Sequence, residues 1–482
     1  MTFMAVSNRR LVLQRYILSV NHSLTSQPHH LSAALIFCQD GITFGYKLND
    51  SDECGGLNPL IRMQAGKKYQ LRLENQAAQP TNIHTHGLHI PGDGNTDDVS
   101  QHRQKHTLDI FFDRVLSSNG FLLQITRVAP SGSCLFYNWT IPEDHMDGTF
   151  WYHAHVHELT EDQVNGGALG VLLIDPAESA DLSDRPDWVH EQRLLLLTTQ
   201  QNGRVQRANG EASTTIRVEA NVWTRLRVIV ADPRGRNRDL FFESEFCEVH
   251  AAAHDGVWRN RVPSSEESSL YRVTGASRID LVIRCSQNAN MYYNSGIIDP
   301  LNLPASPMVS FDVSGSTTNA VPTPLEFWNP VRPSYLQSLM NEDIPNDTFD
   351  VQLGPDNING VAFDPTTPLE TFTHGTTQQW RLRGTQGHPF HLHLYHMQIV
   401  QPGGCGGMYA EGEWFDVISA EIQGSCRVRF PMDDIAGKMM FHCHILAHED
   451  DGTMGWAQIV GGPPHGTDHV ASQVCDSECY AP

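Results

Sequence analysis

Residues 278–285 read RIDLVIRC, a short and largely apolar segment. Runs of this length, with alternating or continuous apolar residues and with Gly, Pro, Asn or Asp at their ends, are typical of β-strands. Long amphipathic helices are absent from the pattern, so the sequence predicts an all-β fold built from sandwiches. Similar segments along the chain are YQLRLEN from Tyr69, GVLLID from Gly170, RLRVIV from Arg225, QQWRLRG from Gln378 and CRVRF from Cys426.

The length of the chain suggests the number of domains. At 482 residues, and with about 150 residues in a typical domain, the chain is expected to form three domains. Small and polar residues gather at 175–186 (DPAESADLSDRP) and at 314–324 (SGSTTNAVPTP), as they do in linkers. The predicted domains are therefore residues 1–180, 181–320 and 321–482.

One stretch of the first predicted domain breaks this pattern. Residues 100–124 read SQHRQKHTLDIFFDRVLSSNGFLLQ, a charged and then apolar segment within an otherwise turn-rich loop. An inserted lobe, an ordinary long surface loop and an error in the gene model, such as a retained intron, all fit these residues. The sequence leaves the three interpretations open.

The charge of the chain excludes one class of partner. The formal net charge is -22 at pH 7, and no basic patch of the kind that binds phosphate groups is present, so nucleic acid is not an expected partner. The acidic balance favours cationic or neutral small molecules over anionic ones, although it does not identify one. No run of about 18 apolar residues occurs, so no transmembrane helix is expected.

The signals for localisation point weakly towards export. An apolar stretch near the N-terminus is short and is interrupted by Gln14 and Arg15, which makes it a poor core for a signal peptide. Among the ten cysteines, Cys475 and Cys479 are plausible disulfide partners, and the other pairings cannot be read from the sequence. Four glycosylation triplets, which lean towards a secreted or extracellular protein, begin at Asn21, Asn49, Asn138 and Asn346.

Four clusters of closely spaced histidines stand out, two in the first third of the chain and two in the last. The first two clusters are His-x-His pairs, His84 with His86 and His153 with His155. On a β-strand, residues i and i+2 project to the same face, so both imidazoles can reach one metal ion or two neighbouring ions. An isolated pair is more often a surface or hydrogen-bonded feature, so each pair alone is weak evidence.

The last two clusters favour a metal site over the hydrogen-bonded interpretation. Residues 388–393 read HPFHLH and residues 442–448 read HCHILAH. Burying so many imidazoles is costly unless each is satisfied, and metal coordination does this at once. A cysteine flanked by histidines, with another histidine five residues on, is typical of a trigonal His2Cys copper site. One zinc ion would use four ligands, and most of these side chains would then have no metal ion to bind, so several copper ions are favoured.

These motifs resemble those of the multicopper oxidases, the family of laccases, ascorbate oxidase, bilirubin oxidase and the bacterial spore-coat and cuprous oxidases. The resemblance spans nearly the whole chain and implies three cupredoxin-like Greek-key β-sandwich domains, with copper ligands in the first and last. Besides the histidine clusters, it includes IPEDHMDGTFWYHAHVH from Ile141, QVNGGALGVLLID from Gln163, AAHDGV from Ala252 and WFDVI from Trp414.

The resemblance also implies four copper ions with defined ligands. The trinuclear cluster would lie between the first and last domains. Because His442 and His444 adjoin Cys443 in the chain, an electron would have a short covalent route to that cluster. The implied ligands are His388, Cys443 and His448 for the type 1 copper, His84 and His391 for the type 2 copper, and His86, His153, His155, His393, His442 and His444 for the type 3 pair.

The function that the resemblance implies is that of a laccase-like enzyme. Phenols or similar small donors would be oxidised one electron at a time at the type 1 copper, and dioxygen would be reduced to water at the trinuclear cluster. The expected partners are therefore a small electron donor and dioxygen, and the protein is expected to be a monomer. Two alternatives stay open: a metal-ion oxidase acting on Fe(II), Cu(I) or Mn(II), and a copper-binding homologue without turnover.

Two carboxylates are candidates for delivering protons to the trinuclear cluster. Glu449 directly follows His448 and matches the position of a proton-relaying acid in several bacterial relatives. Asp97 is a second candidate near the first motif. A solvated carboxylate that stabilises nearby ligands is an equally good interpretation of both residues.

The chain departs from the family pattern at the axial position of the type 1 copper. Ten residues after Cys443, where the family commonly has Met, Leu or Phe, this chain has Thr453, and Met454 follows. We expect Met454 to be the axial ligand, because Gly452 makes a one-residue shift of the loop easy and a coordinating methionine is common in relatives.

Overall fold

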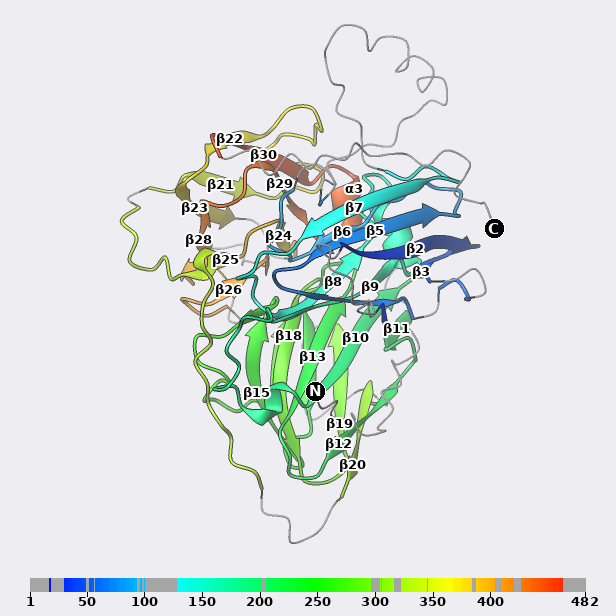
Figure 1. Cartoon of the computed structure of the whole chain (residues 1–482), viewed down its shortest axis with the longest axis vertical. Coiled ribbons are helices and arrows are strands. Elements are labelled where there is room, and N and C mark those ends of the chain that lie inside the picture. Colours follow the sequence, from blue (N-terminus) through cyan, green and yellow to red (C-terminus); the bar gives the residue numbers. More distant parts are fainter. Residues whose placement is uncertain are drawn as a thin grey trace, which may run out of the picture.

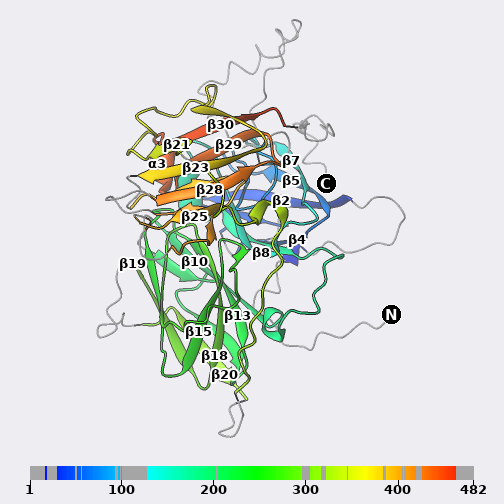
Figure 2. The same cartoon turned by 90° about the vertical axis from the view of Figure 1, so that its left-hand side faces the viewer.

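A computed structural model gives the arrangement of most of the chain (Figures 1 and 2). In the part that it describes, strands make up nearly all of the regular structure, and the α-helices are short, α2 (Thr160–Asn165) and α3 (Leu446–Asp450). The predicted all-β fold is confirmed. The structure describes residues 17–18 and 30–462, apart from 49–51, 56, 93–95, 98, 100–127, 202–204, 296–303, 305, 316–321, 345, 384–386, 404, 406–408 and 420–425.

The first third of the chain forms a β-sandwich. Its strands are β1 (Ile17–Leu18), β2 (His30–Asp40), β3 (Thr43–Lys47), β4 (Leu60–Gln64), β5 (Lys68–Asn75), β6 (His84–His86), β7 (Cys134–Thr140), β8 (Gly148–His153) and β9 (Leu169–Asp175). One sheet has the order β1-β4-β9-β8-β6 and the other β3-β2-β5-β7. Phe150 and Leu172 of the first sheet share a buried cluster with Leu71 and Tyr137 of the second, so the two sheets pack face to face.

The middle third forms a second sandwich. Its strands are β10 (Gln192–Gln200), β11 (Val205–Ala208), β12 (Thr214–Glu219), β13 (Thr224–Ala231), β14 (Arg238–Phe242), β15 (Cys247–His254), β16 (Val257–Trp258), β17 (Leu270–Val273), β18 (Arg278–Cys285), β19 (Ala289–Ser295) and β20 (Val309–Ser314). The sheets have the orders β11-β10-β13-β18-β15-β16 and β12-β20-β19-β14-β17. Leu226 and Ile279 of the first sheet pack with Leu240 and Phe311 of the second.

The last third forms the remaining sandwich of the described residues. Its strands are β21 (Phe349–Gln352), β22 (Glu370–Thr373), β23 (Thr376–Arg383), β24 (Phe390–Leu392), β25 (Met397–Gln401), β26 (Trp414–Phe415), β27 (Val417–Ile418), β28 (Cys426–Met432), β29 (Gly437–Cys443) and β30 (Met454–Val460). The sheets have the orders β21-β23-β28-β25-β26 and β22-β30-β29-β24-β27. Trp380 of one sheet and Phe441 of the other belong to the same buried cluster.

The strand-like segments of the sequence form β5, β9, β13, β18, β23 and β28. Burial explains their two kinds of pattern. Along β5 buried residues alternate with less buried ones, as expected for a strand with one face towards a core. Every residue of β13 is buried, because Leu226 faces the core of the middle third while Ile229 packs with Trp151 of the first third.

The three sandwiches are arranged so that the first and last thirds lie beside each other above the middle third (Figure 1). One buried apolar cluster joins them, with Trp151 from the first third, Ile229 from the middle third, and Val417 and Leu446 from the last. Each sheet takes its strands from one third of the chain, although the predicted domain limits themselves stay a prediction. This arrangement brings the four histidine motifs to the contact between the first and last thirds.

Disulfides connect described residues within each sandwich: Cys38–Cys54, Cys247–Cys285 and Cys405–Cys426. The suggested partners Cys475 and Cys479, and the segment 100–124, lie outside the described residues. Among the helices that the structure describes, none is long and apolar enough to span a membrane.

Candidate metal centre

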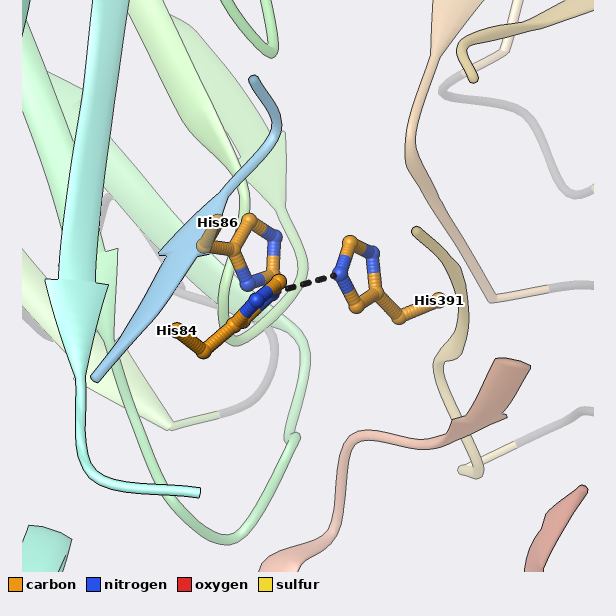
Figure 3. A group of neighbouring side chains, drawn as sticks. All are labelled: His84, His86 and His391. Atoms are coloured by element: carbon orange, nitrogen blue, oxygen red, sulfur yellow. Dashed lines mark hydrogen bonds between the residues drawn. The ribbon is translucent and has the colours of Figure 1, made fainter. Parts of the chain in front are cut away.

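Two pairs of neighbouring strands carry most of the histidines. In the first third, β6 pairs with β8 and places His84 opposite His153. In the last third, β24 pairs with β29 and places His391 opposite His442. Figure 3 shows His84 and His86 facing His391 across the contact between these two parts of the chain. The Nε2 atoms of His84 and His391 are 3.5 Å apart.

Eight histidines form what we call the interdomain cluster. Each is at most 1% exposed. They make three groups in which one ring nitrogen of each residue lies within 4.8 Å of the others. Every group contains histidines from both the first and the last third. The groups are His84, His86 and His391; His86, His153 and His444; and His155, His393 and His442.

The interdomain cluster has the protonation state that a metal site needs. Burial lowers the pKa of seven of its histidines, that of His153 to about 3 and that of His155 to about 4. These rings are therefore neutral near pH 7 and keep a nitrogen lone pair. Both ring nitrogens of His86 and of His444 lack a hydrogen-bond partner among the described residues. Buried nitrogens without partners are costly, and coordination of a metal ion would satisfy them.

Hydrogen bonds orient several rings of the cluster. His391 Nδ1 lies 2.9 Å from the backbone oxygen of Asp416, and His153 Nδ1 lies 2.9 Å from that of Ala154. A ring nitrogen that faces a carbonyl oxygen must carry the proton, so Nε2 of both rings keeps its lone pair. The Nε2 atom of His442 lies 3.1 Å from that of His393 and 3.3 Å from that of His155. One proton cannot satisfy three converging nitrogens, whereas one metal ion can.

The second centre consists of His388, Cys443 and His448. The Sγ atom of Cys443 lies 3.6 Å from His388 Nδ1 and 3.9 Å from His448 Nδ1, and the two Nδ1 atoms are 3.2 Å apart. Cys443 is fully buried, whereas both histidines are half-buried. Burial raises the pKa of the Cys443 thiol to about 12, so a thiolate at this position needs a bound cation. Two imidazoles and one thiolate in this geometry suit copper.

The register of β29 and β30 decides between Thr453 and Met454. His442 is paired with Met454, and the amide of Cys443 donates to the carbonyl oxygen of Thr453 at 3.0 Å. Paired residues of an antiparallel ladder point to the same face, so Met454 lies on the face of His442 and Thr453 on that of Cys443. Met454 is buried among Val99, Met440 and Trp456. In this register Thr453, and not Met454, lies on the face of Cys443, and the identity of the axial ligand stays a prediction.

The two candidate carboxylates lie against the interdomain cluster. Glu449 is fully buried, with Oε2 3.0 Å from His442 Nδ1 and Oε1 3.5 Å from His155 Nδ1. Asp97 is 3% exposed, with Oδ2 2.8 Å from His84 Nδ1 and 3.6 Å from His393 Nδ1. Each carboxylate thus contacts one histidine from each terminal third, and neither is in open solvent.

Sequence reasoning missed a buried ion pair behind the cluster. Asp416 of the last third binds Arg278 of the middle third, and both side chains are at most 1% exposed. The backbone of Asp416 also holds His391. Two motifs were the available signals: WFDVI contains Asp416, and AAHDGV contains the neighbouring Asp255. Neither motif indicates that Arg278 is the residue bound by Asp416.

Comparison with known proteins finds similarity to multicopper oxidases. Family models described as multicopper oxidase match residues 55–108 and 323–461. The multicopper oxidase mco of Staphylococcus aureus is 23% identical, over 87% of each chain. The bilirubin oxidase of Albifimbria verrucaria is 24% identical, over 85% of this chain and 72% of that protein.

Solved structures show the same fold at low sequence identity. A multicopper oxidase from Pediococcus acidilactici superposes with a TM-score of 0.69 at 18% identity, over 93% of this chain and 91% of that one. One from Campylobacter jejuni gives 0.65 at 19%, over 92% and 95%. The predicted cupredoxin-like fold is thereby confirmed. Both terminal thirds of the chain match models of the multicopper oxidase family, whose members are copper oxidoreductases that use oxygen.

Proposed function

We propose that the protein is a laccase-like oxidase that takes single electrons from phenols or similar small donors and reduces dioxygen to water. The observation that carries the proposal is the pairing of a half-buried His2Cys centre with a buried cluster of eight histidines. Four copper ions, one of type 1, one of type 2 and two of type 3, would use all ten histidines and the cysteine. When bound, these ions supply one-electron storage between a one-electron donor and a four-electron acceptor.

The His2Cys centre is the proposed type 1 site and receives electrons from the donor. His388 and His448 are half-buried, whereas Cys443 is not exposed. A donor at the surface therefore reaches the edge of an imidazole before it reaches the sulfur. The buried surroundings of Cys443 keep water from the thiolate.

The interdomain cluster is the proposed trinuclear site. We assign His84 and His391 to the type 2 copper because they lie on opposite sides of the contact between the terminal thirds, with Nε2 atoms 3.5 Å apart. The groups that contain His444 and His442 are the two type 3 sites. Cys443 lies between these two histidines in the chain, so its backbone leads directly to one ligand of each type 3 site.

Glu449 and Asp97 are the proposed proton-holding residues. The Oε2 atom of Glu449 faces His442 Nδ1 at 3.0 Å, and Oδ2 of Asp97 faces His84 Nδ1 at 2.8 Å. Both carboxylates reach the buried histidines directly, and reduction of dioxygen to water consumes protons at that place. The same contacts fix the orientation of the two rings, so each carboxylate acts both as a proton carrier and as a support for a ligand.

Thr453 occupies the proposed axial position of the type 1 site. Its side-chain hydroxyl donates to the backbone oxygen of Gly354 at 3.1 Å. This hydrogen bond fixes the direction of the hydroxyl group. The threonine side chain is short, and its oxygen is a poor ligand for a soft thiolate-bound copper. We propose that this centre has no strong axial ligand.

Export is the proposed localisation. The disulfides Cys38–Cys54, Cys247–Cys285 and Cys405–Cys426 support it, because such bonds persist mainly in oxidising compartments.

A steady-state comparison of donors tests the proposal. Protein with its copper content counted is given a phenol, Fe(II), Cu(I) or Mn(II), and oxygen uptake is measured for each donor. We expect the largest kcat/KM with the phenol. Faster uptake with a metal ion would favour a metal-ion oxidase, and no uptake at full copper occupancy would favour a copper-binding protein without turnover. Cys443→Ser, which removes the thiolate, is the control for non-enzymatic oxidation of the donor.

A further inference from the structure

The middle third supplies none of the proposed copper ligands, yet one of its side chains binds a residue that contacts the interdomain cluster. Arg278 begins β18 and its side chain is fully buried. Its Nη1 and Nη2 atoms donate to Oδ1 and Oδ2 of Asp416 at 2.7 and 2.5 Å. This is a bidentate, charge-assisted contact between the middle and last thirds of the chain.

Asp416 in turn contacts two histidines of the cluster. Its backbone oxygen accepts a hydrogen bond from His391 Nδ1 at 2.9 Å, and its Oδ1 atom lies 3.5 Å from His86 Nε2. The rings of His86 and His391 stack, with centroids 3.8 Å apart and planes at 9°. One residue thus faces both rings of a stacked pair that joins the first and last thirds.

The orientation of His86 depends on this carboxylate. Its Nε2 atom lies 3.5 Å from Asp416 Oδ1 without a hydrogen bond. A proton on Nε2 would meet this carboxylate, and Nδ1 would then be free to bind a metal ion. A ring that coordinates through Nδ1 carries its proton on Nε2, and Asp416 Oδ1 is the acceptor that faces this proton. The negative charge of the carboxylate thus favours the tautomer of His86 that has its proton on Nε2 and presents Nδ1 to a metal ion.

The backbone around the ion pair leaves little freedom for Arg278 and Asp416 to move. A side chain at Gly87 would place its Cβ 2.2 Å from Arg278 Nη2 and 2.5 Å from Asp416 Oδ2. The glycine after His86 therefore lets the backbone of the first third pack directly against the ion pair. Asp255 adds a second anchor. Its Oδ1 accepts the Arg278 amide at 2.8 Å, and its Oδ2 accepts the Asp416 amide at 3.1 Å.

We infer that Arg278 is a positioning residue for the trinuclear site: its guanidinium holds Asp416, and Asp416 orients His86 and His391. The inference rests on the proposed function, because it needs the interdomain cluster to bind copper. Without Arg278, the Asp416 carboxylate has no bidentate partner in a site without solvent, and it would turn away from His86. Loss of a residue that orients a ligand typically weakens metal binding by about 10- to 100-fold.

A role limited to holding domains together is the competing interpretation, and Arg225 is the matched control. Arg225 is an equally buried arginine of the neighbouring strand β13. It forms a buried ion pair with Asp280, and its guanidinium lies 3.9 Å from the centroid of the Trp258 ring. None of these contacts involves a histidine of the interdomain cluster. Arg225→Lys therefore weakens the packing of the middle third without disturbing Asp416.

The test measures copper affinity separately at the two centres. Wild type, Arg278→Gln, Arg278→Lys and Arg225→Lys are loaded with Cu(II) and titrated with a chelator, while copper per chain, visible absorption and thermal unfolding are recorded. We expect Arg278→Gln to lose the copper outside the His2Cys centre at about 10- to 100-fold lower chelator concentration and to keep its visible band. Arg278→Lys should be intermediate, and Arg225→Lys should change only the unfolding temperature.

The opposite result is also clear. If Arg278→Gln holds all its copper as tightly as wild type and loses only thermal stability, the inference is overturned. If that variant does not fold, Asp416→Ala decides, because it keeps the backbone contact to His391 but removes both side-chain oxygens that face His86 and Arg278. Retention of wild-type copper affinity in Asp416→Ala would overturn the inference equally. Wild-type protein that binds copper only at the His2Cys centre would overturn the proposed function, and the inference with it.

Discussion

His86 and His391 stack against each other with ring centroids 3.8 Å apart, although one lies in the first third of the chain and the other in the last. The interdomain cluster therefore exists only while the two terminal sandwiches are docked. This separates its properties from those of the His2Cys centre, whose three side chains all come from the last third.

Removal of either proposed type 2 ligand should separate colour from turnover. His84→Ala and His391→Ala each disrupt the interdomain cluster and leave His388, Cys443 and His448 in place. We expect both variants to lose oxygen uptake and to keep the intense visible absorption of the His2Cys copper. Absorption spectra and oxygen-electrode traces of copper-loaded protein provide the check. Bleaching of the band in a folded variant would show that the ligands are divided wrongly between the two centres.

Cys443→Ser should remove both colour and activity. The serine oxygen cannot replace the thiolate that gives the site its absorption, and the electron route from the donor to His442 and His444 begins at that sulfur. The circular dichroism of the variant should match wild type, because the substitution is small. A variant that stays blue would contradict the assignment of Cys443.

The axial position gives a prediction that reverses the expectation from sequence. Because Met454 lies on the face of His442, Met454→Leu should leave the type 1 reduction potential almost unchanged. Thr453→Met should lower the potential, since a thioether on the face of Cys443 supplies the axial ligand that threonine does not. A redox titration followed by the visible band measures both. A clear shift of the potential in Met454→Leu, with none in Thr453→Met, would show that Met454 and not Thr453 lies at the axial position.

The copper-free protein should lose stability in acid through His145. Burial lowers the pKa of His145 to about 3, and its Nε2 accepts the backbone amide of His89 at 3.1 Å, which a protonated ring cannot do. Below the ordinary value of 6.5 the unfolded chain takes up a proton that the folded chain does not. The free energy of unfolding therefore falls by about 1.4 kcal/mol per pH unit from this group as the pH decreases from 6.5 towards 3.

Urea titrations between pH 7.5 and 5 measure this slope. His145→Gln should give a shallower pH dependence than wild type, by close to one proton. His190→Gln is the matched control, because His190 is exposed, and we expect its slope to equal that of wild type. An unchanged slope in His145→Gln would mean that other groups govern the acid lability.

Local patterns predicted the strands and the grouping of the histidines. The alternation along β5 and the continuous apolar run of β13 follow directly from which faces are covered. The His-x-His pairs could be predicted to converge because strand geometry puts both side chains on one face. Side-chain pairing across distant parts of the chain was not predictable. Arg278 and Asp416 are 138 positions apart, and no local sequence pattern indicates that they form an ion pair.

The preference for Met454 was formed without knowledge of the strand register. A shift of one residue in a strand exchanges its two faces, so residue type alone could not decide between Thr453 and Met454. The hydrogen bonds between β29 and β30 decide it. The preference for methionine relied on the ligands usual in relatives, whereas the register is set by backbone pairing.

The stoichiometry of oxygen reduction decides whether the protein reduces dioxygen fully to water. Protein with four copper ions per chain is supplied with a phenol in excess, and the donor oxidised, the oxygen consumed and any hydrogen peroxide released are measured together. We expect four electrons to be taken from the donor for each dioxygen consumed, with no release of peroxide. Two electrons per dioxygen with release of peroxide, or no oxygen uptake by fully loaded protein, would contradict it.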